Sequence, residues 1–144
     1  MDGVDYGALM SAAISAREYS HSPYSGFAVG AALLCADGGV FTGCNIENAA
    51  FTSTVCAERV AVFKAASQGK KQIGDFVAIA VAGAPRGEAP TEPCAPCGVC
   101  RQVLAEFCNL DNFQVVLGTS RDDFKVYTLG EILPLAFTGK AFAD

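Results

Sequence analysis

The run FVAIAVA, at residues 76–82, constrains the fold more than any other stretch, because it carries no polar or charged side chain. A short, continuous apolar run is typical of a strand that is buried on both faces of a sheet. Helices are predicted on both sides of it: one starts near Thr52–Thr54 and ends at Gly69, and another starts at Pro96. A buried strand between crossover helices predicts a layered α/β fold.

Hydrophobic periodicity and turn signals predict the remaining elements. Helical spacing covers residues 5–19. Four further strands are expected at residues 27–35, 40–45, 114–118 and 124–128. Thr128 and Glu131 form a capping-box pattern ahead of a short last helix. Together these segments predict a three-layer α/β/α sandwich with a mixed five-stranded sheet, formed by a single domain over residues 1–144.

Residues 83–95, GAPRGEAPTEPCA, separate the buried strand from the helix that follows it. Their glycine and proline content predicts a loop. The loop is longer than most connections, and long ordered loops often have a functional role.

The composition limits the function classes. Apolar residues make up 51% of the chain and charged residues 17%, which is typical of a well-buried globular protein. The net charge of −5 argues against a nucleic-acid binder, which usually needs a basic face. No apolar run approaches the ~20 residues of a membrane-spanning helix. Seven cysteines and an N-terminus without the plan of a signal peptide predict a reducing compartment, and we expect a cytoplasmic protein.

Three cysteines in the stretch CAPCGVC have the two-residue gaps that suit a metal site. They form two overlapping pairs, so both pairs cannot serve the same kind of site. Cys97 and Cys100 share one face of the first turn of the predicted helix, whereas Cys94 precedes that turn. Cys56 lies in the first turn of the other helix, and helix N-termini favour thiolates. We therefore predict a metal site formed by Cys56, Cys97 and Cys100.

Glu58 lies two positions after Cys56, so it can point near the metal without being a ligand. Catalytic zinc takes three protein ligands and leaves one position for water. A carboxylate beside that water can accept its proton and deliver it elsewhere. Glu58 is therefore the candidate proton carrier of a zinc enzyme.

The two halves of this site match the signature H-x-E followed by P-C-x-x-C of the zinc deaminases, in which three cysteines are a permitted ligand set. Here the halves are CAE at residues 56–58 and PCGVCRQV at residues 96–103. The chain resembles the small, homotetrameric cytidine deaminases that act on free nucleosides. The resemblance covers residues 12–137 and includes PYSGFAVGAAL, GCNIENAA, CAERVAVFKA and LPLAF.

The resemblance implies zinc-dependent hydrolytic deamination of cytidine and 2′-deoxycytidine to uridine and 2′-deoxyuridine, a reaction of pyrimidine salvage. In this scheme zinc-activated water attacks C4 of the cytosine ring. Glu58 moves the water's proton to N3 and then to the departing amino group, and ammonia leaves. Three thiolates over-neutralise Zn²⁺, and Arg59 is the candidate donor that offsets their charge.

The resemblance also implies the substrate contacts. Asn45 and Glu47 hold the ribose hydroxyls, since an amide and a carboxylate can satisfy a 3′-hydroxyl as donor and acceptor. Phe27 lines the base pocket. Backbone groups of Ala57 and Ala95 meet the pyrimidine O2 and the amino group.

Two aromatic residues are assigned to contacts between subunits. Phe51 and Phe137 occupy positions that, in the family, reach into a neighbouring subunit's site. Tyrosine is often found at the first of these positions, so a hydroxyl contact is expected to be missing here. We expect a homotetramer with shared active sites and one zinc ion per subunit.

Three alternatives stay open on the sequence. If Cys94 joined the other three cysteines, four thiolates would close the zinc shell and leave a non-catalytic module. A polynucleotide deaminase that flips bases is disfavoured by the acidic charge. A deaminase of another aminopyrimidine, of the blasticidin type, shares CAE and PCGxCRQV, although the NIEN stretch at residues 45–48 favours nucleosides.

Overall fold

The computed structural model describes residues 3–142 and contains the strands that the sequence predicts. The strands are β1 (Phe27–Cys35), β2 (Val40–Cys44), β3 (Phe76–Pro85), β4 (Gln114–Ser120) and β5 (Asp123–Thr128). The helices are α1 (Tyr6–Ala16), α2 (Ala57–Ser67), α3 (Gly98–Phe107) and α4 (Leu129–Ile132). Short 3₁₀ turns cover Arg17–Tyr19, Phe51–Ser53 and Gly139–Phe142. Among the residues described, no helix has the length and apolar composition needed to cross a membrane.

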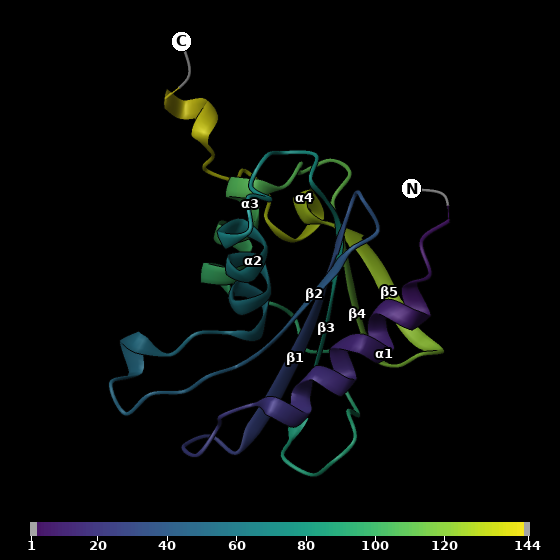
Figure 1. Cartoon of the computed structure of the whole chain (residues 1–144), viewed down its shortest axis with the longest axis vertical. Helices are drawn as coiled ribbons and strands as arrows, with labels where there is room; N and C mark the ends of the chain where they lie inside the picture. Colours follow the sequence, from purple (N-terminus) through teal and green to yellow (C-terminus); the bar gives the residue numbers. More distant parts are fainter. Residues whose placement is uncertain (1–2, 143–144) are drawn as a thin grey trace.

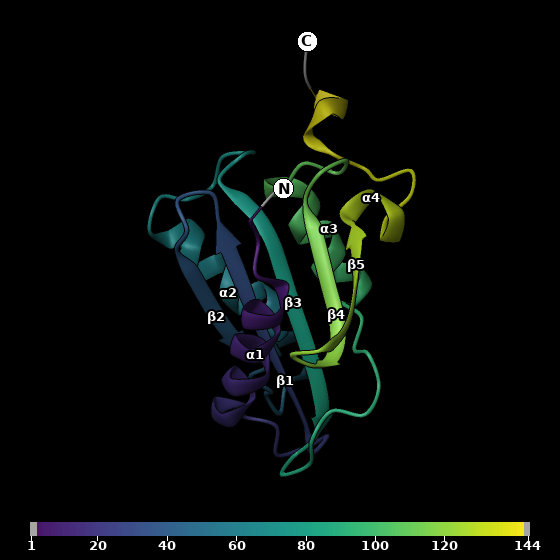
Figure 2. The ribbon, with the colours of Figure 1, turned by 90° about the vertical axis from the view of Figure 1, so that its right-hand side faces the viewer.

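The strands form one sheet in the order β2-β1-β3-β4-β5. β3 and β4 are parallel and joined through α3, whereas the other neighbouring pairs are antiparallel. Figures 1 and 2 show α1 on one face of this sheet and α2 with α3 on the other. The predicted three-layer α/β/α sandwich with a mixed five-stranded sheet is confirmed.

The central strand β3 contributes to both hydrophobic cores. Ala78, Ala80 and Ala82 pack into the core beneath α1, whereas Ile79 and Val81 pack into the core beneath α2 and α3. A strand covered on both faces needs apolar side chains at successive positions, because neighbouring residues point to opposite faces. This requirement explains why the run at residues 76–82 contains no polar residue.

The start of α2 differs from the prediction. The helix starts at Ala57 and not near Thr52–Thr54, because Phe51–Ser53 forms a separate 3₁₀ turn. Cys56 has extended backbone angles (φ −75°, ψ 156°) and is the N-cap of the helix. The cysteine therefore lies directly at the N-terminus of α2 instead of within its first turn.

The start of α3 also differs. The helix starts at Gly98 and not at Pro96, since Cys97 has extended backbone angles (φ −68°, ψ 169°) and is the N-cap. Cys97 thus has the same position on α3 that Cys56 has on α2.

The loop between β3 and α3 starts and ends later in the chain than the predicted loop of residues 83–95. β3 continues through Gly83 to Pro85, where it pairs with Phe27 at the start of β1. The connection is the segment of residues 86–97, called the 86–97 loop below. β1 lies far from residues 83–85 in the sequence, and pairing with it outweighs the local glycine and proline signals.

The capping box of Thr128 and Glu131 is present and starts α4. The helix ends at Ile132, because Leu133 precedes Pro134 and the residue before a proline is disfavoured in helical conformation. The chain beyond it therefore leaves the body of the protein, as Figure 1 shows at the C-terminal end.

Candidate active site and metal centre

Cys56, Cys97 and Cys100 form the one metal-competent group found among residues 3–142. Their Sγ atoms all lie within 4.8 Å of one another. The Cys56 and Cys97 sulfurs are 3.8 Å apart, and those of Cys97 and Cys100 are 3.5 Å apart. Tetrahedral zinc with Zn–S bonds of about 2.3 Å separates its sulfur ligands by about 3.8 Å. The three cysteines therefore fit one tetrahedral metal ion.

Two helix N-termini bring these sulfurs together. Cys56 and Cys97 are the N-caps of α2 and α3, and Cys100 lies in the first turn of α3. Gly43 of β2 sets the position of α2, because a Cβ there would lie 2.3 Å from the carbonyl oxygen of Ala57. The partial positive charge of each helix N-terminus favours thiolates at this point.

The thiol contacts within the group shift its pKa values in opposite directions. A hydrogen bond from Cys100 lowers the pKa of Cys56 to about 5. The same contact, together with burial, raises the pKa of Cys100. A cation at the centre of the group would relieve this competition, since all three sulfurs could then be thiolates.

Arg59 lies beside the sulfurs. Its Nη2 donates a hydrogen bond to Cys56 Sγ at 3.3 Å, and this bond raises the pKa of the guanidinium. Its Nε is buried and has no hydrogen-bond partner among the described residues. The arginine thus places positive charge where three thiolates would leave an excess of negative charge.

Glu58 is buried in the first turn of α2, with 4% of its surface exposed. It is not a member of the three-cysteine group. Burial raises the pKa of its carboxyl group, and the neighbouring Cys56 thiolate raises it further. A carboxyl group with a raised pKa can accept and release a proton closer to neutral pH.

Cys94 lies near the group but outside it. A Cβ on Gly83 would lie 2.9 Å from Cys94 Sγ and 2.8 Å from Cε2 of Phe27, so the thiol and the ring meet over this glycine. Burial raises the pKa of Cys94 to about 11, and the charges of Glu58 and Cys56 add to the shift. The structure does not contain a closed four-cysteine arrangement among the residues it describes.

Asn45 follows β2 and holds the start of β1. Its Oδ1 accepts a hydrogen bond from the amide of Val29 at 2.9 Å and another from the hydroxyl of Ser20. Its Nδ2 donates to the carbonyl of Phe27 at 2.8 Å. The second N–H of this amide has no acceptor among residues 3–142 and can donate to a ligand.

Glu47 holds the turn before β1. Its Oε1 accepts hydrogen bonds from the amides of Tyr24 (2.9 Å) and Ser25 (3.1 Å), and its Oε2 accepts one from the Ser25 hydroxyl. The bond from Ser25 lowers the pKa of the carboxyl group. A hollow of about 390 Å³ is lined by this carboxylate, Tyr24, Ser25, Phe51 and Thr54.

The serines that pair with Asn45 and Glu47 were not predicted. Ser20 directly precedes the segment HSPYSG at residues 21–26, and Ser25 lies within it. A turn that is rich in hydroxyls was the available signal, since such side chains commonly hydrogen-bond nearby backbone and polar groups.

The other predicted residues differ in exposure. Phe27 starts β1 and is 37% exposed, Ala57 is buried at the N-terminus of α2, and Ala95 is exposed in the 86–97 loop. Phe51 and Phe137 are 76% and 62% exposed. Figure 1 shows that the turns Phe51–Ser53 and Gly139–Phe142 project from the body of the protein. Within one chain these two rings are largely open to solvent.

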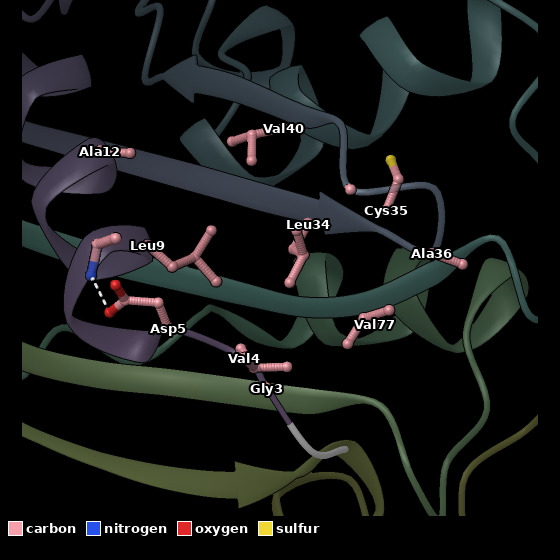
Figure 3. A pocket seen from close by; sticks show the side chains of 12 residues that line it. Gly3, Val4, Asp5, Leu9, Ala12, Leu34, Cys35, Ala36, Val40 and Val77 are labelled. Atoms are coloured by element: carbon pink, nitrogen blue, oxygen red, sulfur yellow. Dashed lines mark hydrogen bonds between the residues drawn. The ribbon is translucent and has the colours of Figure 1, made fainter.

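A second hollow, of about 360 Å³, lies between α1 and the β1–β2 hairpin, on the face of the sheet away from α2 and α3 (Figure 2). Figure 3 shows that apolar side chains such as Leu9, Leu34 and Val77 line it. Its carboxylate, Asp5, caps α1 by accepting a hydrogen bond from the amide of Ala8 at 2.9 Å. The three-cysteine group and Glu58 are on the other face, on the side of α2 and α3.

Comparisons with known proteins agree with this site. Residues 5–117 match the family model of the cytidine and deoxycytidylate deaminase zinc-binding region. A cytidine deaminase of Halalkalibacterium halodurans is 48% identical over 98% of this chain and 100% of its own length. The crystal structure of a cytidine deaminase from Burkholderia pseudomallei, also 48% identical, superposes with a TM-score of 0.79 over 90% of this chain and 97% of that one.

A more distant relative is named for a different substrate. A blasticidin-S deaminase of Bacillus cereus is 30% identical over 76% of each chain. The expected zinc cofactor agrees with the matched zinc-binding region and with the three-cysteine group. The chain is a member of the cytidine and deoxycytidylate deaminase family of zinc-binding proteins.

Proposed function

We propose that the protein hydrolyses cytidine and 2′-deoxycytidine to uridine and 2′-deoxyuridine, with release of ammonia. The observation that carries this proposal is the buried carboxyl group of Glu58 beside three cysteine sulfurs that fit one tetrahedral metal. The relatives named cytidine deaminase, which match almost the whole chain, support the same reaction and substrate.

Cys56, Cys97 and Cys100 hold one zinc ion in this proposal, and Arg59 offsets their negative charge through its bond to Cys56. When bound, zinc acts as a Lewis acid that makes a water molecule nucleophilic at neutral pH. The cysteines would supply three protein ligands, the number that a catalytic zinc site uses.

Glu58 carries protons in the reaction. Its carboxylate accepts a proton from the attacking water and delivers it to N3 of the pyrimidine ring. After C4 becomes tetrahedral, Glu58 passes the second proton of the water to the exocyclic amino group, which leaves as ammonia. Burial suits the side chain to both steps, because its raised pKa reduces the free-energy cost of the protonated form.

The remaining residues bind the nucleoside. Phe27 lies against one face of the base, the amide of Ala57 donates to O2, and the carbonyl of Ala95 accepts from the amino group. The free N–H of Asn45 and the carboxylate of Glu47 pair with the 3′-hydroxyl. Since this hydroxyl is common to cytidine and 2′-deoxycytidine, both are expected substrates.

The reaction is tested by measuring ammonia release from cytidine by the zinc-loaded protein. Cytidine and 2′-deoxycytidine should be deaminated, and cytosine without a sugar should be a much poorer substrate. Blasticidin S is included because of the relative that carries its name. Turnover of blasticidin S in preference to cytidine would overturn the proposal in favour of another aminopyrimidine, and steep salt-dependent binding of single-stranded oligonucleotides would favour a polynucleotide deaminase.

We also propose a homotetramer with shared active sites, formed by a single deaminase domain over residues 1–144 that works in cytoplasmic pyrimidine salvage. The exposed rings of Phe51 and Phe137 support contacts with a second copy of the chain. Light scattering should give about 60 kDa, four times the 14.9 kDa of one chain. Phe137→Ala should raise the KM for cytidine, and a fully active monomer would contradict the shared site.

A further inference from the structure

Arg17, directly after α1, holds three separate parts of the backbone together. Its Nε donates a hydrogen bond to the carbonyl of Ala28 at 2.8 Å. Its Nη2 donates to three further carbonyls, those of Ala84 (3.1 Å), Pro85 (3.3 Å) and Glu88 (2.9 Å). The guanidinium therefore joins the start of β1, the end of β3 and the first turn of the 86–97 loop.

The arginine can approach these carbonyls because residue 30 is glycine. A Cβ on Gly30 would lie 1.9 Å from the carbonyl oxygen of Ala13, 2.9 Å from the amide nitrogen of Arg17 and 3.0 Å from its Cγ. A larger side chain at this position would push the end of α1 away from β1. The close approach of helix and strand thus allows the guanidinium to reach over the sheet.

The segments that Arg17 joins carry walls of the proposed nucleoside pocket. Phe27 and Gly83 directly precede two of the residues whose carbonyls it binds. The Phe27 ring and the Cys94 thiol meet over Gly83, within 2.8 Å and 2.9 Å of the place where its Cβ would be. A shift of the loop relative to β1 would therefore change the space next to the base.

The 86–97 loop has few other attachments. At its start, the amide of Arg86 donates to the segment before β1 at 2.8 Å. At its end, Nε of Arg101 donates to the carbonyl of Pro96 at 2.8 Å. Residues 89–95 make no main-chain hydrogen bond to any other residue that the structure describes. Two arginine side chains therefore hold the two ends of the loop.

We propose that Arg17 is a positioning residue for the nucleoside pocket: it keeps Cys94 and Ala95 beside Phe27 before the substrate binds. The proposal rests on the proposed function. Without Arg17 the loop must be ordered by the substrate itself, which weakens binding more than it slows the chemical step. The metal site is less affected, because Arg101 holds the backbone immediately before α3.

The test compares Arg17→Ala with Arg86→Ala in the full, zinc-loaded chain. Arg17→Ala should raise the KM for cytidine about tenfold and change kcat by less than about twofold, as expected for lost hydrogen bonds that only order the pocket. Its zinc content should equal that of the wild type. Arg86 is the matched control: it lies in the same loop with an exposed side chain that donates no hydrogen bond to the described residues, so its variant should keep the wild-type KM.

Chemical rescue separates positioning from a general loss of stability. A hollow of about 400 Å³, lined in part by Ser15, Arg17 and Arg86, opens beside the guanidinium, so a small ion can reach its place. Guanidinium chloride at a non-denaturing concentration should lower the KM of Arg17→Ala toward the wild-type value, whereas sodium chloride at equal ionic strength should not. Arg17→Lys keeps the charge but lacks the planar guanidinium group and its several N–H donors, so it should give an intermediate KM.

An unchanged KM in folded, zinc-loaded Arg17→Ala overturns the proposal, and so does a raised KM that does not respond to guanidinium. If this variant does not fold, Arg17→Lys decides in its place. Amide hydrogen exchange over residues 86–97 should be faster in the variant than in the wild type, with α3 unchanged. This exchange measurement tests the role of Arg17 even if the wild type releases no ammonia from cytidine, a result that overturns the proposed function alone.

Discussion

Glu58→Gln is expected to lower kcat for cytidine deamination by about 10²- to 10⁴-fold, the usual contribution of a positioned acid–base group. The glutamine has nearly the same shape, so the packing around a side chain that is only 4% exposed should be kept. The amide cannot accept the proton of the attacking water or return it to the leaving group. The variant should therefore bind zinc and substrate while failing in the chemical step.

The measurement is steady-state ammonia release by protein whose zinc content has been determined for each preparation. Glu106→Gln is the matched control, because Glu106 has an exposed side chain near the end of α3 and the same substitution there should leave kcat unchanged. A zinc-loaded Glu58→Gln protein with wild-type kcat would exclude Glu58 as the proton carrier. Loss of zinc from this variant would instead indicate that Glu58 takes part in zinc binding.

Cys97→Ser is expected to lose both zinc and activity. The Cys97 sulfur lies 3.8 Å from that of Cys56 and 3.5 Å from that of Cys100, so it is close to both other ligands. A serine hydroxyl is a much weaker zinc ligand than a thiolate, because it stays protonated at neutral pH. The stabilisation that zinc provides should disappear with it, so the chelated and zinc-treated variant should unfold at the same temperature.

Cys94→Ser is the matched control for this prediction. The same substitution three residues earlier in the chain removes a thiol that lies outside the three-cysteine group, so zinc and kcat should both be retained. Zinc content and thermal unfolding with and without a chelator measure the difference between the two variants. Zinc loss from Cys94→Ser would overturn the ligand assignment and favour a four-cysteine module.

The three-cysteine group and the position of Glu58 next to Cys56 were predictable from short stretches of sequence. The gap between Cys97 and Cys100 and the position of Glu58 two residues after Cys56 are local, so a helix start by itself determines how these side chains lie relative to each other. The fold class was predictable for a similar reason. The buried run at residues 76–82 lies within one strand, and the helical spacing before and after it lies within single helices.

Element boundaries were less predictable where distant contacts decide them. The extension of β3 to Pro85 depends on pairing with Phe27, and the start of α2 at Ala57 follows a 3₁₀ turn that no local signal distinguished from a first helical turn. The capping box of Thr128 and Glu131 was found from the sequence because both of its hydrogen bonds are made within four residues.

Spacing along the chain encodes the order of the elements, the layered sheet and the residues able to bind zinc. The tertiary fold brings the sulfurs of Cys56 and Cys97 together although they are 41 positions apart in the sequence, and it places Cys94 beside Phe27, outside the three-cysteine group. It also decided that Arg17 binds carbonyls from three segments. These contacts join parts of the chain that the sheet brings together, and their partners are backbone groups that every residue carries, so no sequence pattern marks them.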